Sequence, residues 1–272
     1  MSLAEELDPT SSPLAFYATD LRRMRTARGI SQRTFARSAL MAASLLNKIE
    51  AGVRLPSMEL SVVADATFGT VDHFQRLWRL VIKFAYPAWF RPFVELEEAA
   101  VAIRSFQVQV VPGLLQTEEY ARAVFAGGRP DADSLEKKVA SRMARQLILE
   151  RENPPELWVV LDEYVLRRSV AEPAVMRAQF QRLIDAASVP STVIQVVPFS
   201  AGAHAGFGGS FSALTLDEGP GVVLADGFLQ GQILADPEDV KAALRAYNLL
   251  AAVALPPKAS IDLVAAAMKE LK

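Results

Sequence analysis

The chain has 272 residues, of which 51% are hydrophobic, so it is long enough for two domains and can build a sizeable core. It contains no cysteine, which excludes disulfides and thiolate metal sites and is typical of a reducing cytoplasm. Apolar runs such as 249–255 are too short to cross a bilayer, and no signal peptide opens the chain. We therefore expect a soluble, cytoplasmic protein without a membrane partner.

The charge is unevenly distributed along the chain. The formal net charge is −2, which alone argues against a nucleic-acid binder. Residues 13–56, however, hold eight basic and two acidic side chains, a balance of +6 that leaves −8 on the rest. A basic module attached to an acidic body is the electrostatic footprint of a protein that binds phosphates through one part only.

The N-terminal part is predicted to be helical throughout. Apolar side chains recur at helical spacing, and Gly, Ser and Pro separate the segments. Ser31 is a suitable N-cap for the second helix, and Gly29, Gly52 and Gly69 are suitable helix ends. The predicted helices are 14–28, 32–38, about 42–51, a fourth that begins after Pro56-Ser57 and ends before Gly69, and a fifth at 71–84.

The segment 31–57, SQRTFARSALMAASLLNKIEAGVRLPS, resembles the helix-turn-helix of phage-repressor type, also called the XRE family. The resemblance covers roughly residues 14–80. It implies that the third helix (about 42–51) enters the major groove of double-stranded DNA while the second lies across the backbone. Carried onto this sequence, it assigns the DNA-binding residues Gln32, Arg33, Ala42, Ala43, Ser44, Asn47, Lys48 and Arg54.

Within that resemblance the residues differ in role. Gln32 and Arg54 are expected at phosphates, whereas Ser44, Asn47 and Lys48 can hydrogen-bond base edges. Glu50 is expected to be structural and to pair with an arginine of the first or second helix. The chain departs from the family at the turn position that is usually Gly. That position is Leu40, and a left-handed leucine would be strained by roughly 1 kcal/mol or more, so we expect the turn to differ in detail.

A second departure is that Ala42 and Ala43 can touch thymine methyl groups but cannot hydrogen-bond bases. The alternative to DNA binding is a small helical protein-interaction module with a solvated basic face.

Beyond the helical part, we expect a multi-domain chain with an α/β or α+β domain. The predicted ranges are a flexible N-terminus at 1–13, the DNA-binding domain at 14–84, a Pro/aromatic linker at 85–94 and a regulatory domain at 95–272. Runs rich in β-formers predict a sheet of about four or five strands at 106–111, 157–161, 192–197, 210–216 and 221–225. Predicted helices lie at 95–104, 117–125, 134–150, 174–187, 236–254 and 260–271.

The C-terminal part has a resemblance of its own. The segments VPGLLQTEEYARAV, RMARQLIL, VLDEYVLRR and QVVPFSAGAHAGFGGSF resemble an uncharacterised sensor-like domain that follows XRE-type modules in antitoxin-like actinobacterial regulators. The resemblance covers about 95–271 and implies transcriptional regulation, often with a small partner protein. It implies no particular ligand. Near residue 225, where that family often has Glu, this chain has Asp226.

Four residues are candidate ligand-binding groups in the C-terminal part: Asp162, Glu163, His204 and Asp226. Asp162-Glu163 follows a strand and can line a cleft, or it can simply stabilise the start of a short helix that ends in arginines. The loop 200–209 is rich in glycine but lacks a phosphate-binding signature, so it is either a lid or a plain connection. We expect no catalytic residue, metal site or cofactor, because the C-terminal part has a single histidine and the chain has no cysteine, which offer too little chemistry.

Two functions fit these observations. The first is a sequence-specific transcriptional regulator whose C-terminal domain forms a homodimer, with the apolar C-terminal helices as candidate interface, and senses a small-molecule effector or partner protein. The second is an enzyme of unknown reaction that uses Asp162, Glu163 and His204 and carries an N-terminal DNA- or protein-binding anchor.

Overall fold

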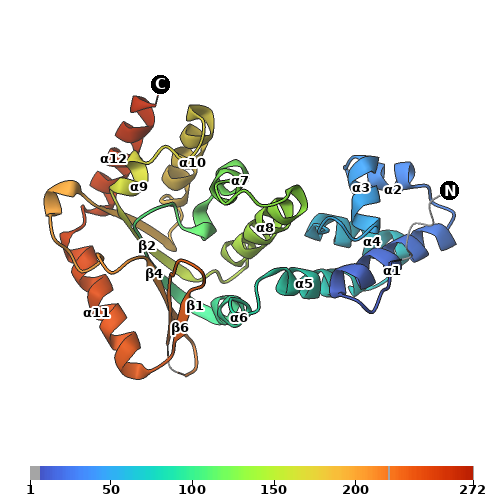
Figure 1. Ribbon diagram of the computed structural model, residues 1–272, viewed down its shortest axis with the longest axis horizontal. Coiled ribbons are helices and arrows are strands. Elements are labelled where there is room, and N and C mark those ends of the chain that lie inside the picture. The colour runs from blue at the N-terminus through green and yellow to red at the C-terminus, as the bar shows by residue number, and fades with distance from the viewer. Residues whose placement is uncertain (1–6, 220, 272) are drawn as a thin grey trace. The chain divides into compact units, whose positions relative to one another are not determined.

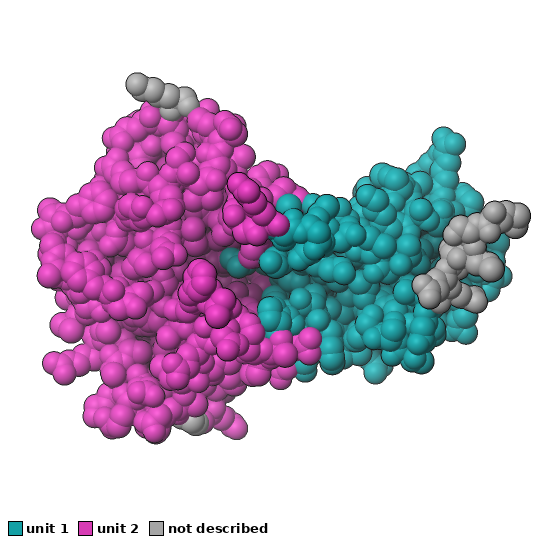
Figure 2. Space-filling view, viewed as in Figure 1, with its two compact units in different colours: residues 1–87, 130–144 teal, residues 88–129, 145–272 magenta. Residues whose placement is uncertain are grey.

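A computed structural model describes residues 7–219 and 221–271, so part of the predicted flexible segment, residues 1–6, lies outside the described residues. The chain divides into two compact units (Figure 2). The helical unit comprises Met1–Pro87 and Pro130–Ala144, and the sheet unit comprises Ala88–Arg129 and Arg145–Lys272. The multi-domain organisation predicted from the sequence is therefore confirmed.

Five helices follow one another at the start of the helical unit (Figure 1): α1 (Pro13–Ala27), α2 (Gln32–Ser38), α3 (Ala43–Glu50), α4 (Met58–Phe68) and α5 (His73–Ala85). The predicted end signals are confirmed. The hydroxyl of Ser31 accepts a hydrogen bond from the Thr34 N–H, and Ser57 caps α4 in the same way. Gly29, Gly52 and Gly69 all have positive φ at the helix ends.

Aromatic side chains fill the core of the helical unit. Phe35 of α2 stacks on Phe68 of α4 with ring centroids 5.2 Å apart, and Tyr17 of α1 meets Phe74 of α5 edge-on at 5.3 Å. Asp65 accepts hydrogen bonds from the Phe74 and Gln75 N–H groups at the start of α5. Burial raises the pKa of Asp65, but its hydrogen bonds outweigh burial and leave that pKa below the ordinary value.

A further helix of this unit comes from much later in the chain. Helix α8 (Ala132–Arg145) belongs to the helical unit up to Ala144. The Tyr86 hydroxyl donates a hydrogen bond of 2.6 Å to the Ser141 carbonyl, and both residues are buried. The sequence predicts one helix over 134–150, but α8 ends at Arg145 and a 3₁₀ turn continues over Gln146–Leu149.

The sheet unit contains a mixed sheet. Its strands are β1 (Ala100–Gln107), β2 (Glu156–Asp162), β3 (Thr192–Val197), β4 (Phe211–Leu216), β5 (Val222–Ala225) and β6 (Gln232–Leu234). They lie in the order β3-β2-β1-β4-β5-β6, with β1, β2 and β3 parallel and the pairs from β1–β4 onwards antiparallel. The helices are α6 (Arg91–Ala99), α7 (Glu118–Ala126), α9 (Tyr164–Arg167), α10 (Pro173–Ala186), α11 (Pro237–Val253) and α12 (Pro257–Glu270).

Helices cover both faces of the sheet (Figure 1). Val159 and Leu161 of β2 join the larger core with Phe180 of α10 and Val264 of α12. Val160 points to the other face and packs with residues of α11. This alternation is what the two-residue period of a strand requires when both faces are buried.

Two further predicted elements differ from the structure. The predicted helix 95–104 ends at Ala99, because residues 100–107 form β1 at the centre of the sheet, paired with β2 on one side and β4 on the other. The predicted strand 106–111 therefore begins too late. The described residues form six strands rather than four or five, since the three-residue β6 was not predicted.

Among the described residues, no single helix is long and apolar enough to cross a membrane, and α11 and α12 reach that length and composition only as a pair bent by 72°.

Candidate nucleic-acid interface

Helix α3 presents a polar face to solvent because its apolar face is buried. Leu46 and Ile49 are almost fully buried in the core. Ser44, Asn47 and Lys48 lie on the opposite side of the helix and are exposed, as is Ala42 immediately before it. Ala43 is half-buried. The structure thus brings together on one face the side chains that the sequence predicts to read bases.

A buried ion pair fixes the orientation of this face. Arg25 of α1 donates two hydrogen bonds to Glu50 at the end of α3, with N–O distances of 2.6 and 2.8 Å. Its third donor reaches the Ile30 carbonyl at 2.7 Å. Donating these hydrogen bonds to the Glu50 carboxylate raises the pKa of Arg25, so the guanidinium stays charged. The predicted structural role of Glu50 and its pairing with an arginine of the first helix are confirmed.

Gln32 ties α2 to α3. Its side-chain Nε2 donates to Glu50 Oε2 at 2.7 Å and to Asn47 Oδ1 at 3.3 Å. These two bonds use both amide hydrogens, so a phosphate contact from Gln32 would require this side chain to turn. Asn47 keeps its own amide N–H groups for a base, because the contact with Gln32 uses only its oxygen.

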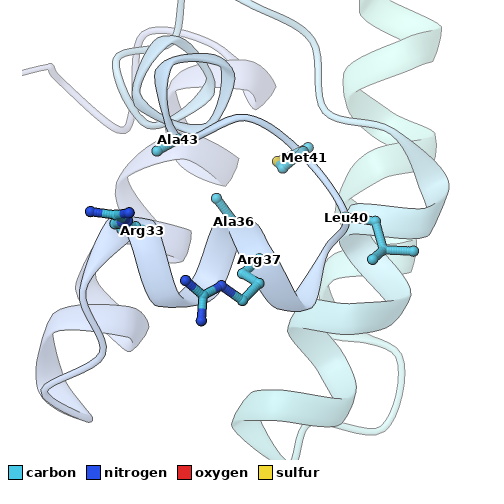
Figure 3. Close-up of a pocket in the computed structure, with 6 residues that line it drawn as sticks. All are labelled: Arg33, Ala36, Arg37, Leu40, Met41 and Ala43. Carbon is cyan, nitrogen blue, oxygen red and sulfur yellow. The ribbon is translucent and has the colours of Figure 1, made fainter.

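Helix α2 and the following turn form a basic surface next to α3. A hollow of about 450 Å³ lies there and is lined by Arg33, Ala36, Arg37, Leu40, Met41 and Ala43 (Figure 3). Arg33 and Arg37 lie one helical turn apart and are both exposed. Two exposed cations at this spacing suit neighbouring phosphates of a DNA backbone. The DNA-binding residues predicted from the sequence include Arg33 but not Arg37. Arg37 lies one turn from Arg33 on the exposed face of α2, and this spacing is visible in the sequence.

Several other basic residues of the N-terminal part have structural partners. Arg28 donates to the carbonyls of Thr67 and Phe68 at the end of α4. Arg54, predicted to hold the DNA backbone, forms an ion pair of 3.1 Å with Glu136 of α8. Arg22, Arg33, Arg37 and Lys48 make no ion pair with any residue that the structure describes. The cationic surface is therefore smaller than the residue count indicates.

The C-terminal candidate residues lie at one edge of the sheet, but not as a single site. Asp162 ends β2, and its carboxylate lies 3.3 Å from His204 Nε2. His204 Nδ1 accepts a hydrogen bond from the Gly206 N–H at 3.1 Å. Both ring nitrogens of this histidine, whose side chain is almost fully buried, therefore have partners within the protein. The Asp162–His204 pair holds the glycine-rich loop 200–209 against the end of β2.

Glu163 is also used structurally. Its carboxylate accepts hydrogen bonds from the Phe199 N–H at 2.9 Å and from Arg167 at 3.0 Å. Asp162 accepts from the Tyr164 N–H at the start of α9. This arrangement corresponds to the simpler alternative, in which the two acids stabilise the start of a short helix that ends in arginine.

Asp226 follows β5, three strands away from β2, on the order of 14 Å at the usual strand spacing. Across 7–219 and 221–271, no group of three or more metal-ligating side chains is placed to hold a metal ion.

The comparisons with known proteins agree with this architecture. Residues 21–71 match a helix-turn-helix family, which places the protein in the class of DNA-binding regulators. Residues 90–266 match a family described as a domain of unknown function, DUF5753. Because this match covers more than half of the chain, the protein belongs to the DUF5753 family. No curated protein and no solved structure matches the chain.

Proposed function

We propose that this protein is a sequence-specific transcriptional regulator that reads the major groove with α3. The observation that carries the proposal is the exposed row of Ser44, Asn47 and Lys48 on a helix fixed from behind by the buried Arg25–Glu50 pair. A base-reading surface must be polar, solvent-exposed and rigid, and this face of α3 meets all three conditions.

Phosphate binding is assigned to Arg33, Arg37 and Arg54. Arg33 and Arg37 are exposed cations beside the reading helix (Figure 3), whereas Arg54 becomes available when its ion pair with Glu136 opens. These contacts position the protein on DNA and supply affinity that does not depend on sequence.

The sheet unit is proposed to form a homodimer and to sense a small molecule or a partner protein, as in antitoxin-like regulators. Helix-turn-helix proteins usually bind two symmetric half-sites, so two copies must be held together. Leu249 and Val253 of α11 support this part of the proposal, because they are about half exposed and lie one turn apart on the outer side of the helix. The proposed location is the cytoplasm, where the DNA target is found.

Substitutions in α3 test whether this helix reads bases, and substitutions in α2 test whether its arginines supply affinity that does not depend on sequence. With DNA selected from a random pool, we expect Asn47→Ala or Lys48→Ala to relax the preference at particular base pairs by about 5- to 100-fold. We expect Arg33→Ala and Arg37→Ala to weaken binding to all sequences alike and to reduce the salt slope by about one each. Fluorescence anisotropy over a salt series measures both effects.

Arg79→Ala is the matched control, because Arg79 is an exposed arginine of the helical unit on α5, outside α2 and α3. It should change neither preference nor salt slope appreciably. An unchanged sequence preference in both Asn47→Ala and Lys48→Ala would show that α3 is not the reading helix.

A further inference from the structure

Helix α8 is attached to the helical unit although its sequence belongs to the other family domain. Residues 132–145 lie within the stretch 90–266 that matches DUF5753, yet α8 groups with α1–α5 as far as Ala144. Val139 is buried, and the Ser141 carbonyl accepts the buried hydrogen bond from Tyr86. The packing of α8 on this unit is therefore specific.

The outer part of α8 lies beside the proposed DNA-reading surface. Glu136 pairs with Arg54 at 3.1 Å, and both side chains are partly buried. Around this ion pair is a cavity of about 300 Å³ that α8 shares with the reading helix and its exit. The lining residues are Ser44, Leu45, Lys48, Arg54, Leu55, Glu136 and Ala140.

DNA and α8 compete for the same groups. Glu136 neutralises Arg54 through its Nη1, and a phosphate placed at this guanidinium would meet the carboxylate at short range. Ser44 and Lys48, two of the three polar reading residues, open into the cavity that α8 closes on one side. The first turn of α8 adds Asp133, whose charge also repels the DNA backbone.

The last residue of α8 is built into the sheet unit. Arg145 donates to the buried Glu97 of α6 with an N–O distance of 2.7 Å, and its guanidinium lies 5.2 Å from the centre of the Phe90 ring. Helix α8 is thus continuous from Ala132 to Arg145, with Glu136 at Arg54 and Arg145 at Glu97. A change in the contacts of Arg145 with α6 acts on the same helix that carries Glu136.

We propose that α8 is an autoinhibitory helix that covers one side of the DNA-reading surface through the Glu136–Arg54 ion pair and is released by events in the sheet unit. This inference rests on the proposed DNA-binding function. It assigns to the DUF5753 domain a regulatory contact within the chain, in addition to any dimerisation.

The first test weakens the contact without touching a DNA-binding residue. Glu136→Gln removes the charge that holds Arg54, so we expect the full-length protein to bind its selected DNA about two- to fivefold more tightly. Glu238→Gln is the matched control: it removes the same charge from an exposed position on α11 and should leave affinity unchanged. Unchanged or weaker binding by Glu136→Gln would contradict the proposal.

The second test locks the contact. Because the chain has no cysteine, Leu55→Cys/Ala140→Cys introduces the only two thiols, both at the α3–α8 cavity. Joining them with a bismaleimide should reduce DNA affinity at least tenfold relative to the same variant with each thiol capped by a monofunctional maleimide. Equal affinity of the joined and capped forms would show that α8 and DNA bind together.

The two proposals fail in different ways. If the wild type selects a DNA sequence but neither Glu136→Gln nor the cross-link changes its affinity, only the autoinhibitory role of α8 is wrong. If neither the wild type nor Glu136→Gln selects any sequence, the proposed DNA-binding function is wrong, and so is the proposed autoinhibitory role of α8.

Discussion

Leu40 adopts a backbone conformation that few side chains tolerate. Its φ is +52°, in the left-handed region, and its side chain is 96% exposed between α2 and α3. The sequence predicts that a turn with leucine in place of glycine differs in detail, but Leu40 adopts the left-handed conformation all the same. An exposed leucine gains little from packing, so the strain is not offset locally.

Replacing Leu40 by glycine should stabilise the helical unit. We expect Leu40→Gly to raise the free energy of unfolding by about 0.5–1 kcal/mol, which is the relief of left-handed strain less the larger chain entropy of unfolded glycine. Leu40→Ala keeps a Cβ in the left-handed region and should change stability by less than about 0.5 kcal/mol. Urea unfolding of both variants measures the difference; equal stabilities would mean that the turn is not strained.

For single residues, the sequence predicts whether a side chain has a structural role better than it predicts which residue that side chain contacts. The charged Glu50 on an otherwise apolar face indicates a buried pair, and the structure supplies Arg25. The position of Gln32 at the start of α2 indicates a phosphate contact, yet its amide reaches Glu50 and Asn47 instead. Which of two nearby acceptors a flexible side chain chooses depends on the packing angle of α2 and α3, which no local pattern specifies.

Among the loops, 200–209 is fixed to the sheet more firmly than its glycines indicate. A Cβ on Gly206 would lie 2.0 Å from the Phe106 ring, so only glycine allows the chain to pass over β1 at that point. His204 adds its bonds to Asp162 and to the Gly206 N–H. Loop 200–209 is therefore held against the sheet at Gly206 and His204.

Two glycines of this loop provide a matched pair of variants. Gly206→Ala should destabilise the sheet unit by about 1–3 kcal/mol, because Phe106 is fully buried and cannot move away. Gly208→Ala should have little effect, since nothing lies within 4 Å of its Cβ. Thermal unfolding followed by circular dichroism compares the two. Equal melting temperatures would show that the loop does not pack on β1.

Helix ends that are set by local signals are predicted correctly, whereas a segment whose structure depends on strand pairing is not. Ser31, Ser57 and Thr117 each cap the helix that they are predicted to start. Residues 100–104 extend a helical pattern in sequence, but pairing with β2 and β4 on both sides makes them a strand. Non-local pairing of this kind overrides local propensity.

In the whole molecule, the two modules can be recognised from sequence but the position of α8 cannot. A basic N-terminal part and an acidic, mixed C-terminal part are visible in composition alone. No local pattern in residues 132–145 indicates that they pack on the helical unit, because this packing depends on Tyr86 and Arg54, which lie far away in sequence.

The most direct measurement is selection of DNA by the purified full-length protein from a random pool, followed by footprinting of the selected site over a salt series. The account predicts one enriched sequence with two symmetric half-sites about one helical turn apart, and a steep fall of affinity with salt. Failure to enrich any sequence above non-specific binding would contradict the assignment of α3 as a DNA-reading helix.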